Sequence, residues 1–227
     1  MKDFDNKKVK DKQKFFAMID RTRYIQRWSL MRNNEQENVA EHSMQTAIFA
    51  HALAIIREQR FPDAKQVKAN DVLAKALFHD VSEVITGDLP TPVKYHDDEI
   101  KRSYKKLEAL AVEDLLKMLP ENMRSIYQVL LIEKELDELS ADAEEVIIAK
   151  LIKAADKLSA YVKCIIEVGQ GNNEFKEALE STREKLIILG DDLPELLVFM
   201  DEFIPAFYLS LDELKSNDLE NFVGELE

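Results

Sequence analysis

Two carboxylates in this sequence stand where the pattern of a helix calls for apolar residues. Asp80 follows Leu73 by seven residues and Leu77 by three, so it continues the core-facing stripe of a predicted helix. Asp156 follows Ile152 by four residues on the stripe of another predicted helix. Because a lone carboxylate in a core is costly to desolvate, two such residues indicate a bound cation.

Two histidines can complete a site for that cation. His42 falls in the first turn of a predicted helix that is apolar almost all round, and His79 directly precedes Asp80. Imidazole nitrogens and carboxylate oxygens together suit a divalent metal, and four protein ligands leave room for water. Glu83, four residues after His79, falls in the same sector of the helix. The sequence therefore predicts one metal ion with four protein ligands: His42, His79, Asp80 and Asp156.

Each ligand taken alone also has a structural explanation. A histidine near a helix start is often a hydrogen-bonded packing residue, and Asp80 could pair with a buried lysine. Lys150, Lys153 and Lys157 flank Asp156, so a salt bridge is the alternative there. What favours the metal is the joint pattern of a histidine, a His-Asp doublet and a distant aspartate, each on its own apolar helix.

The remaining histidines of the chain do not extend this set. His51 lies nine residues after His42, about two and a half helical turns, and so faces away from it. His96 lies among acidic residues and is expected to be solvated. With 4 histidines in all, a single ion is predicted rather than a two-metal centre.

The elements that would position these residues are helices. Asn38, with Glu41 three residues later, has the pattern of a capping box and opens a helix to about Arg57. A second helix begins at residue 70 or 71 and stops before Gly87, and the segment 87–92 must be a loop because two prolines flank Thr91. Further helices are expected over 97–118, 121–133, 144–168, 174–189 and 194–204.

No segment shows sustained alternation of period two, so the predicted fold is all-α. The 227 residues contain 46% hydrophobic residues, 5 glycines and 6 prolines, which is too few turn-formers for a many-stranded sandwich or barrel. We predict one domain over residues 15–213, between a polar, frayed N-terminus (1–14) and an acidic C-terminal tail (214–227).

Charge and cysteine content limit the possible partners and location. The formal net charge of −13 argues against binding a nucleic acid polymer or an anionic membrane. The single cysteine, Cys164, cannot form an internal disulfide, and it is expected to be a buried residue of a helix. Neither a signal peptide nor a run of about 18 apolar residues is present, so a cytoplasmic protein is expected.

The sequence resembles the HD-domain metal-dependent phosphohydrolases. The resemblance rests on the order His42, His79-Asp80, Asp156 and on the strings RYIQRWSLMRN (23–33), ENVAEHSMQTA (37–47), HDVSEVITGDLPTPVKY (79–95) and KAADKLSAYVKC (153–164). These strings are similar to the bacterial branch that removes phosphate from deoxyribonucleoside 5′-monophosphates, and the likeness spans about residues 15–213.

That resemblance implies a single helical HD-domain bundle in which the four ligands hold the metal. The expected metal is cobalt or manganese, and zinc, iron and magnesium are the alternatives. It also implies that Glu83 is the acid or base of proton transfer, and that Asp88 is a second catalytic acid unless it only forms the turn. The bound metal would activate a water and polarise the phosphate. A homodimer is expected on the same ground.

For the substrate, the resemblance implies a phosphate contact from Arg27 and a sugar contact from Trp28 that disfavours ribonucleotides. Lys94 is a weaker candidate for the phosphate. The alternatives are a core tryptophan and, for most of Arg21, Arg23, Arg27 and Arg32, a solvated helix face.

Two other functions compete with this hypothesis. One is a phosphodiesterase or a deoxynucleoside triphosphate triphosphohydrolase of the same superfamily, which the small size and the lack of a broad basic surface disfavour. The other is a catalytically silent nucleotide-binding protein, which has no use for an activated water.

Overall fold

The computed structural model describes residues 13–94, 96–132 and 143–215. Within these ranges every regular element is a helix, and extended residues pair only at the isolated bridge between Gln26 and Asn38. The prediction of an all-α fold is thus confirmed for the part of the chain that is described. None of its helices is both long enough and apolar enough to cross a membrane.

The elements follow one another in this order, with η marking short 3-10 helices. They are α2 (Phe15–Ile19), η1 (Asp20–Tyr24), α3 (Val39–Arg60), α4 (Ala69–Leu77), α5 (Glu83–Thr86), α6 (Thr91–Lys94), α7 (Asp98–Lys117), α8 (Glu121–Leu131), α9 (Ala143–Gly169), η2 (Asn173–Phe175), α10 (Lys176–Gly190), α11 (Pro194–Glu202), η3 (Ile204–Tyr208) and α12 (Leu211–Lys215).

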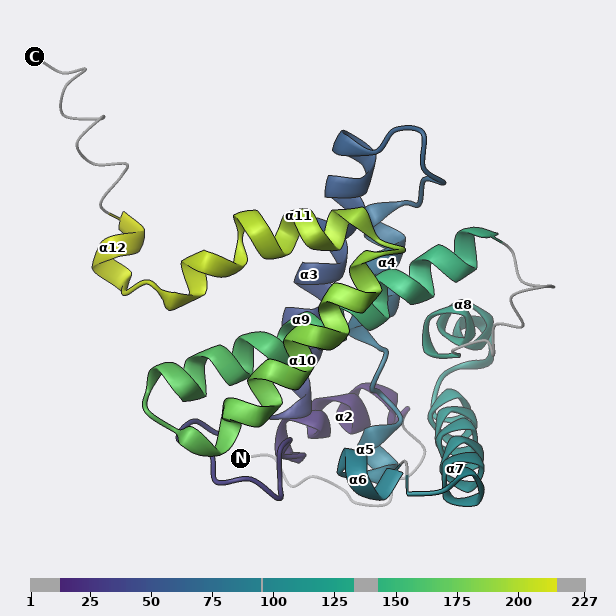
Figure 1. Cartoon of the computed structure of the whole chain (residues 1–227). Coiled ribbons are helices and arrows are strands. Elements are labelled where there is room, and N and C mark those ends of the chain that lie inside the picture. The colour runs from purple at the N-terminus through teal and green to yellow at the C-terminus, as the bar shows by residue number, and fades with distance from the viewer. Residues whose placement is uncertain (1–12, 95, 133–142, 216–227) are drawn as a thin grey trace, which may run out of the picture.

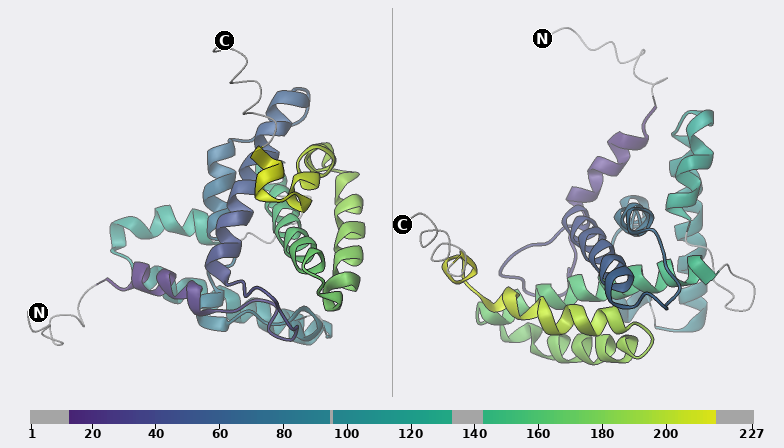
Figure 2. Two further views of the ribbon diagram at one scale, coloured as in Figure 1. Left: turned by 90° about the vertical axis from the view of Figure 1, so that its left-hand side faces the viewer. Right: turned by 90° about the horizontal axis from the view of Figure 1, so that it is seen from above.

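Helices α3 and α9 pack against each other in the middle of the molecule (Figure 1). Helix α4 packs on both of them, while α10 covers α9 and α11 covers α3. Helices α7 and α8 pack on each other and lie apart from α10 and α11 (Figure 2). The turn after α4 lies beside the N-terminal end of α3, since Oδ2 of Asp80 is 3.4 Å from Nε2 of His42.

The apolar stripe predicted along α9 forms the centre of the larger core. Leu151, Ala155 and Leu158 are fully buried, and Ile148 and Val162 are nearly so. This larger core also takes residues from α3, α4, α10 and α11. A smaller core gathers Phe15, Val81 and apolar residues of α7 and α8. Burial of such side chains contributes about 1.5–3 kcal/mol each, so these stripes hold the helices in place.

The capping box at the start of α3 is present. The amide of Glu41 donates to the Asn38 side chain at 3.1 Å, and the Glu41 carboxylate accepts from the Asn38 amide at 3.1 Å. The helix continues to Arg60, three residues beyond the predicted end. This box fixes the first turn of α3, which carries His42.

The helix predicted from residue 70 to Gly87 is wrong as a single element. Helix α4 ends at Leu77, residues 78–82 form turns, and α5 begins at Glu83. Leu77, which we expected in the core, is 42% exposed. The chain bends because Val72 and Ala76 belong to the larger core and Val81 to the smaller one, and a straight helix cannot serve both. Asp80 thus lies on a turn and not on a helical stripe.

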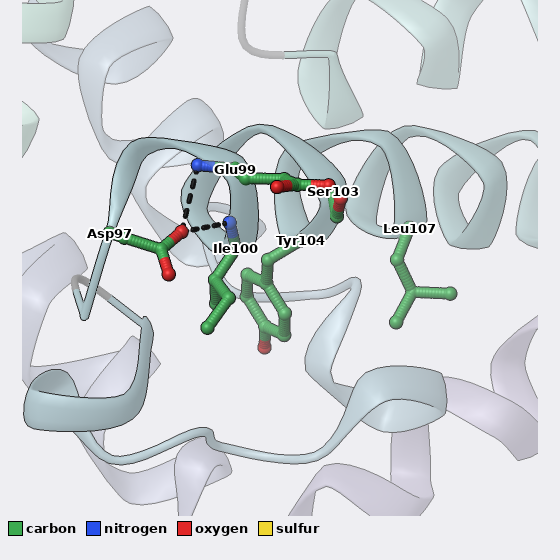
Figure 3. A pocket seen from close by; sticks show the side chains of 6 residues that line it. All are labelled: Asp97, Glu99, Ile100, Ser103, Tyr104 and Leu107. Carbon is green, nitrogen blue, oxygen red and sulfur yellow. Dashed lines mark hydrogen bonds between the residues drawn. The ribbon is translucent and has the colours of Figure 1, made fainter.

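Helix α7 is buried over only part of its length. Ile100 and Leu107 share a helix face with Ala111 and Leu115, yet Ile100 and Leu107 are 37% and 46% exposed, while Tyr104 between them is buried. Figure 3 shows both residues lining an open cavity of about 410 Å³ at the start of the helix. The reason is local, since only the C-terminal half of α7 reaches the smaller core.

Smaller differences concern the loop and the ends of the chain. The loop after Gly87 is shorter than predicted, because α6 begins at Thr91. Gly87 itself has φ of 73°, a backbone conformation that favours glycine. The predicted terminal segments stay predictions, because residues 1–12 and 216–227 lie outside the described residues. The same holds for residue 133, the predicted end of the helix that begins at residue 121.

We expect Asn38→Ala to lower the free energy of unfolding by about 1 kcal/mol, because the amide of Glu41 loses the side-chain oxygen that accepts its hydrogen bond. Denaturant unfolding of the purified protein measures this. Asn38→Ser keeps an acceptor and is expected to stay close to the wild type. An equal loss in both variants would contradict a capping role.

Candidate active site

The structure brings all four predicted ligands together, from three separate elements. His42 comes from α3, His79 and Asp80 from the turn after α4, and Asp156 from α9. Single ligand atoms of His42, His79 and Asp80 lie within 4.8 Å of one another. Asp156 joins them through its Oδ1, which is 3.3 Å from Nε2 of His42. These four residues are called the ligand cluster below.

The two histidines present the same ring nitrogen to the centre of the cluster. Nδ1 of His42 lies 2.9 Å from the Ser159 hydroxyl, which donates to Gln45 at 2.7 Å and therefore accepts from the ring. Nδ1 of His79 lies 2.8 Å from the Ala76 carbonyl oxygen, which can only accept. With both protons on Nδ1, both Nε2 lone pairs are directed at the cluster.

These lone pairs face carboxylate oxygens. Oδ2 of Asp80 lies 3.0 Å from Nε2 of His79 and 3.4 Å from Nε2 of His42. Nε2 of His79 is buried and makes no hydrogen bond. Lone pairs and carboxylates repel each other at such distances unless a ring proton or a metal cation lies between them. The donor set, two imidazoles and two carboxylates, fits a divalent metal.

The pKa values of the cluster show the same demand for positive charge. Burial alone would disfavour the protonated ring of His79, but Asp80 and Asp156 outweigh it and raise its pKa to about 9. Burial likewise opposes ionisation of Asp80, yet the neighbouring histidines hold its pKa well below its usual value. A proton on His79 thus partly replaces the charge that a metal would supply.

Glu83 lies beside the cluster in the first turn of α5. Its side chain is almost buried, and its Oε2 has no hydrogen-bond partner among the described residues. Burial, followed by the charges of Asp80 and Asp88, raises its pKa to about 9. Burial also raises the pKa of Asp88, against the opposing charge of Arg27. Both acids therefore lie within electrostatic reach of the cluster.

Of the four neighbouring arginines in the sequence, Arg27 faces the cluster. Its Nη1 lies 3.8 Å from Oδ2 of Asp80, and its side chain is only 13% exposed. Arg21 and Arg23 are exposed, and Arg32 pairs instead with Glu174. Lys94 pairs with Glu108 at 2.8 Å and lies over the ring of Tyr104, near enough to Glu83 for its charge to lower the pKa there.

Trp28 is half-buried and does not belong to either core. Its ring packs on Phe175 with centroids 5.3 Å apart, and its Nε1 donates to Glu37 at 3.2 Å. Glu37 in turn lies 3.4 Å from Nε of Arg27. Trp28 and Arg27 are thus joined through one carboxylate at the edge of the cluster.

The salt bridge considered for Asp156 is also present. Lys157 donates to Oδ2 of Asp156 at 2.8 Å, while Oδ1 faces His42. One carboxylate therefore serves both arrangements, each through a different oxygen. The lysine leaves a lone pair of Asp156 directed at the ligand cluster.

Comparisons with known proteins agree on the family. The family model described as 5′-deoxynucleotidase YfbR-like matches residues 14–207. Proteins named 5′-deoxynucleotidase from Yersinia pestis and Yersinia pseudotuberculosis are each 45% identical over 206 residues, which covers 91% of this chain and 98% of theirs. This chain belongs to the YfbR-like 5′-deoxynucleotidase family.

Solved structures show the same fold at lower identity. An HD-domain phosphohydrolase from Listeria innocua has a TM-score of 0.70 at 22% identity, covering 94% of this chain and 96% of its own. A cyanophage S-2L HD phosphohydrolase, bound to dA and one catalytic Zn²⁺ ion, has a TM-score of 0.54 at 18% identity, covering 83% and 95%. The predicted HD-domain fold is thereby confirmed.

Sequence reasoning missed three residues of the site in this YfbR-like protein. Ser159 and Gln45 orient His42, and Glu37 links Arg27 to Trp28. The signal for Ser159 was its place three residues after Asp156 on the same helix, which turns both toward α3. Glu37 resembled an ordinary residue of a polar loop.

We expect metal binding to this protein to release protons. Because the pKa of His79 is raised to about 9 without metal, its ring is protonated at pH 7, and a metal must displace that proton. Apparent affinity for Co²⁺ or Mn²⁺ should therefore fall as the pH drops below about 9. Titration calorimetry at pH 7 in buffers of different ionisation enthalpy should detect the release of about one proton. His96→Gln, at an exposed histidine, is the control, and heats that do not depend on the buffer would contradict the prediction.

Proposed function

We propose that this protein is a metal-dependent phosphomonoesterase that hydrolyses deoxyribonucleoside 5′-monophosphates to a deoxyribonucleoside and phosphate. Its family membership supports the reaction and the substrate class. The observation that carries the metal dependence is the convergence of two imidazole Nε2 atoms and Oδ2 of Asp80 in one buried cluster.

The proposed ligands are His42, His79, Asp80 and Asp156, and the proposed ion is cobalt or manganese, with zinc, iron and magnesium compatible with the same donors. When bound, the ion supplies a Lewis acid and lowers the pKa of a water at the site. Ser159 and the Ala76 carbonyl hold the two rings so that their Nε2 lone pairs remain available. The cluster therefore requires no rotation of its histidines to accept a cation.

The cationic residues are proposed to bind the phosphate. Nε of Arg27 is buried without a hydrogen bond, and its guanidinium lies close to the cluster, so it can turn its donors to phosphate oxygens. Lys94 is a second contact whose ammonium already influences Glu83 and Asp88. These two side chains supply positive charge locally in a chain whose net charge is −13.

Glu83 is proposed to move the proton of the reaction, with Asp88 as the second acid. Water adds to phosphorus, the bond to the 5′ oxygen breaks, and that oxygen needs a proton to leave as an alcohol. Because the pKa of Glu83 is raised to about 9, the carboxyl retains a proton near neutral pH and suits donation to the leaving oxygen.

Trp28 is proposed to contact the sugar and to disfavour a 2′ hydroxyl. Its ring stands at the edge of the cluster, next to Arg27 in the chain and stacked on the buried Phe175. A cytoplasmic location is proposed because the single cysteine, Cys164, is a free thiol, as a reducing compartment permits.

We expect Glu83→Gln to lower kcat about 10²–10⁴-fold with little change in bound metal, since only proton transfer is removed. The measurement is phosphate release from dAMP with Co²⁺ or Mn²⁺, together with metal analysis. Glu58→Gln, at an exposed glutamate of α3, is the matched control. Retention of more than a tenth of the activity would refute the assignment. Release of triphosphate from dATP with no phosphate from dAMP would refute the proposed function.

A homodimer is proposed as the working form. Large apolar side chains are exposed after α11, namely Phe203, Tyr208, Leu209 and Leu211. We expect light scattering to give twice the 26.2 kDa mass of the chain. The pair Leu209→Glu and Leu211→Glu should shift the protein to monomer, whereas Ile126→Glu, at an exposed residue of α8, should not. A wild-type monomer would contradict the proposal.

A further inference from the structure

The loop that carries Arg27 and Trp28 connects η1 to α3, and only its two ends are held by each other. The amide of Val39 donates to the Ile25 carbonyl at 3.0 Å, and the amide of Arg27 donates to the Glu37 carbonyl at 2.9 Å. Between about residues 28 and 36, no backbone hydrogen bond joins the two arms of the loop to each other. Something else must therefore hold the middle.

Glu167, near the end of α9, supplies that support. It is fully buried, and its carboxylate accepts from the amides of Asn34 at 2.9 Å and Glu35 at 3.1 Å. The Asn172 side chain donates to it at 2.7 Å, and Lys163 donates at 2.5 Å. Burial opposes ionisation, but these donors outweigh it and lower the pKa of Glu167 to about 2. The carboxylate is thus charged throughout the physiological pH range.

The donors to Glu167 contact the loop as well. Lys163 also donates to the Glu35 carbonyl, and Asn172 donates to the Arg32 carbonyl at 2.7 Å. Together, Lys163, Glu167 and Asn172 satisfy backbone groups along the middle of the loop. We call these three residues the loop clamp.

Trp28 depends on the same support. Its φ is +57°, which is costly for a bulky residue and persists only when the surroundings enforce it. The Asn33 side chain donates to the Trp28 carbonyl at 3.2 Å, one residue before the clamped Asn34. The Trp28 ring rests on Phe175, over whose ring the Lys163 ammonium lies at 5.7 Å. The clamp therefore contacts both the loop and the platform of the indole.

The clamp is separate from the ligand cluster although the same helix carries both. Glu167 is eleven residues after Asp156, about 16 Å along the helix axis. Asp156, Lys163 and Glu167 share one face, because the intervals of seven and eleven residues bring the helix back to nearly the same direction. An open cavity of about 230 Å³ borders Glu37, His42 and Lys163, between the two groups.

We propose that Glu167, with Lys163 and Asn172, is a positioning residue that holds Trp28 in its strained conformation and so sets the preference for deoxyribose over ribose. This inference rests on the proposed function, in which Trp28 faces the sugar. The clamp contacts the middle of the loop, whereas Arg27 is held at the end of the loop by the Glu37 carbonyl, so clamp variants should leave Arg27 and the ligand cluster in place.

Trp28 is the only tryptophan of the chain, so its fluorescence reports on the loop without any substrate. Glu167→Gln places an amide against the Lys163 ammonium, and we expect at least a twofold rise in acrylamide quenching of Trp28. The ratio of kcat/KM for dAMP to that for AMP should fall about tenfold, chiefly through a rise in kcat/KM for AMP, because a displaced Trp28 no longer excludes the 2′ hydroxyl. Turnover of p-nitrophenyl phosphate, which has no sugar, and bound metal should stay within about twofold of the wild type.

Asn172→Asp is the second variant, used because Glu167→Gln could fail to fold. It keeps the oxygen that caps Glu174 but removes both amide donations and places a carboxylate against Glu167. Glu195→Gln is the matched control, since Glu195 is also fully buried and pairs with Arg57 at 2.8 Å, away from the loop. It should lower stability but leave Trp28 quenching and the sugar ratio unchanged.

Unchanged quenching and an unchanged sugar ratio in Asn172→Asp and in any folded Glu167→Gln would overturn the proposal, as would an equal change in Glu195→Gln. A quenching change with an unaltered sugar ratio would overturn the role in selectivity. Failure of the proposed function is distinguishable, because the wild type would then release no phosphate from dAMP while the quenching experiment still tests the clamp.

Discussion

The structure depends on one electrostatic constraint, the meeting of two carboxylates and two imidazole lone pairs in a nearly buried space. Asp80 and Asp156 approach Nε2 of His42 to 3.4 and 3.3 Å, distances at which these groups repel one another unless a ring proton or a metal cation lies among them. Four of the seven buried side-chain atoms without hydrogen bonds in the described residues surround this point: Arg27 Nε, Glu37 Oε1, His79 Nε2 and Glu83 Oε2. Since buried polar groups are normally paired, this concentration of unpaired ones is consistent with the proposed binding of metal and substrate at this point.

Much of the fold follows from local pattern. The stripe of α9 and the capping box of α3 each contain enough information within one segment to specify a helix and its buried face. The bend after α4 does not, because it reflects a competition between two cores that residues Val72 and Val81 enter separately. A hydrophobic pattern cannot express that competition, so the continuous helix predicted from residue 70 was wrong although the His-Asp pair was found.

The candidate site likewise has one part that the local sequence predicts and another part that it does not. His79, Asp80 and Glu83 are neighbours in the chain, so their spacing alone suggested that they act together. Glu167 lies four residues after Lys163, and such a pair on a helix commonly indicates a solvated ion pair. Its burial comes from a loop more than 130 residues earlier, whose amides of Asn34 and Glu35 need an acceptor. Local sequence contains no trace of that need, which explains why motif reasoning found the ligand cluster and missed its supports.

Helix α9 contributes residues to both the ligand cluster and the loop clamp. It carries Asp156 of the ligand cluster, then Ser159, which orients His42, and finally the pair that holds the loop of Trp28. Because a helix has a fixed rise, the distance between the ligand cluster and the loop clamp is set by the number of intervening residues and not by side-chain packing. A rigid element that joins the two keeps the loop of Trp28 in register with the ligand cluster. If Trp28 and the cluster have the proposed roles, substitutions near Glu167 would change which sugar is accepted and leave the four residues of the ligand cluster in place.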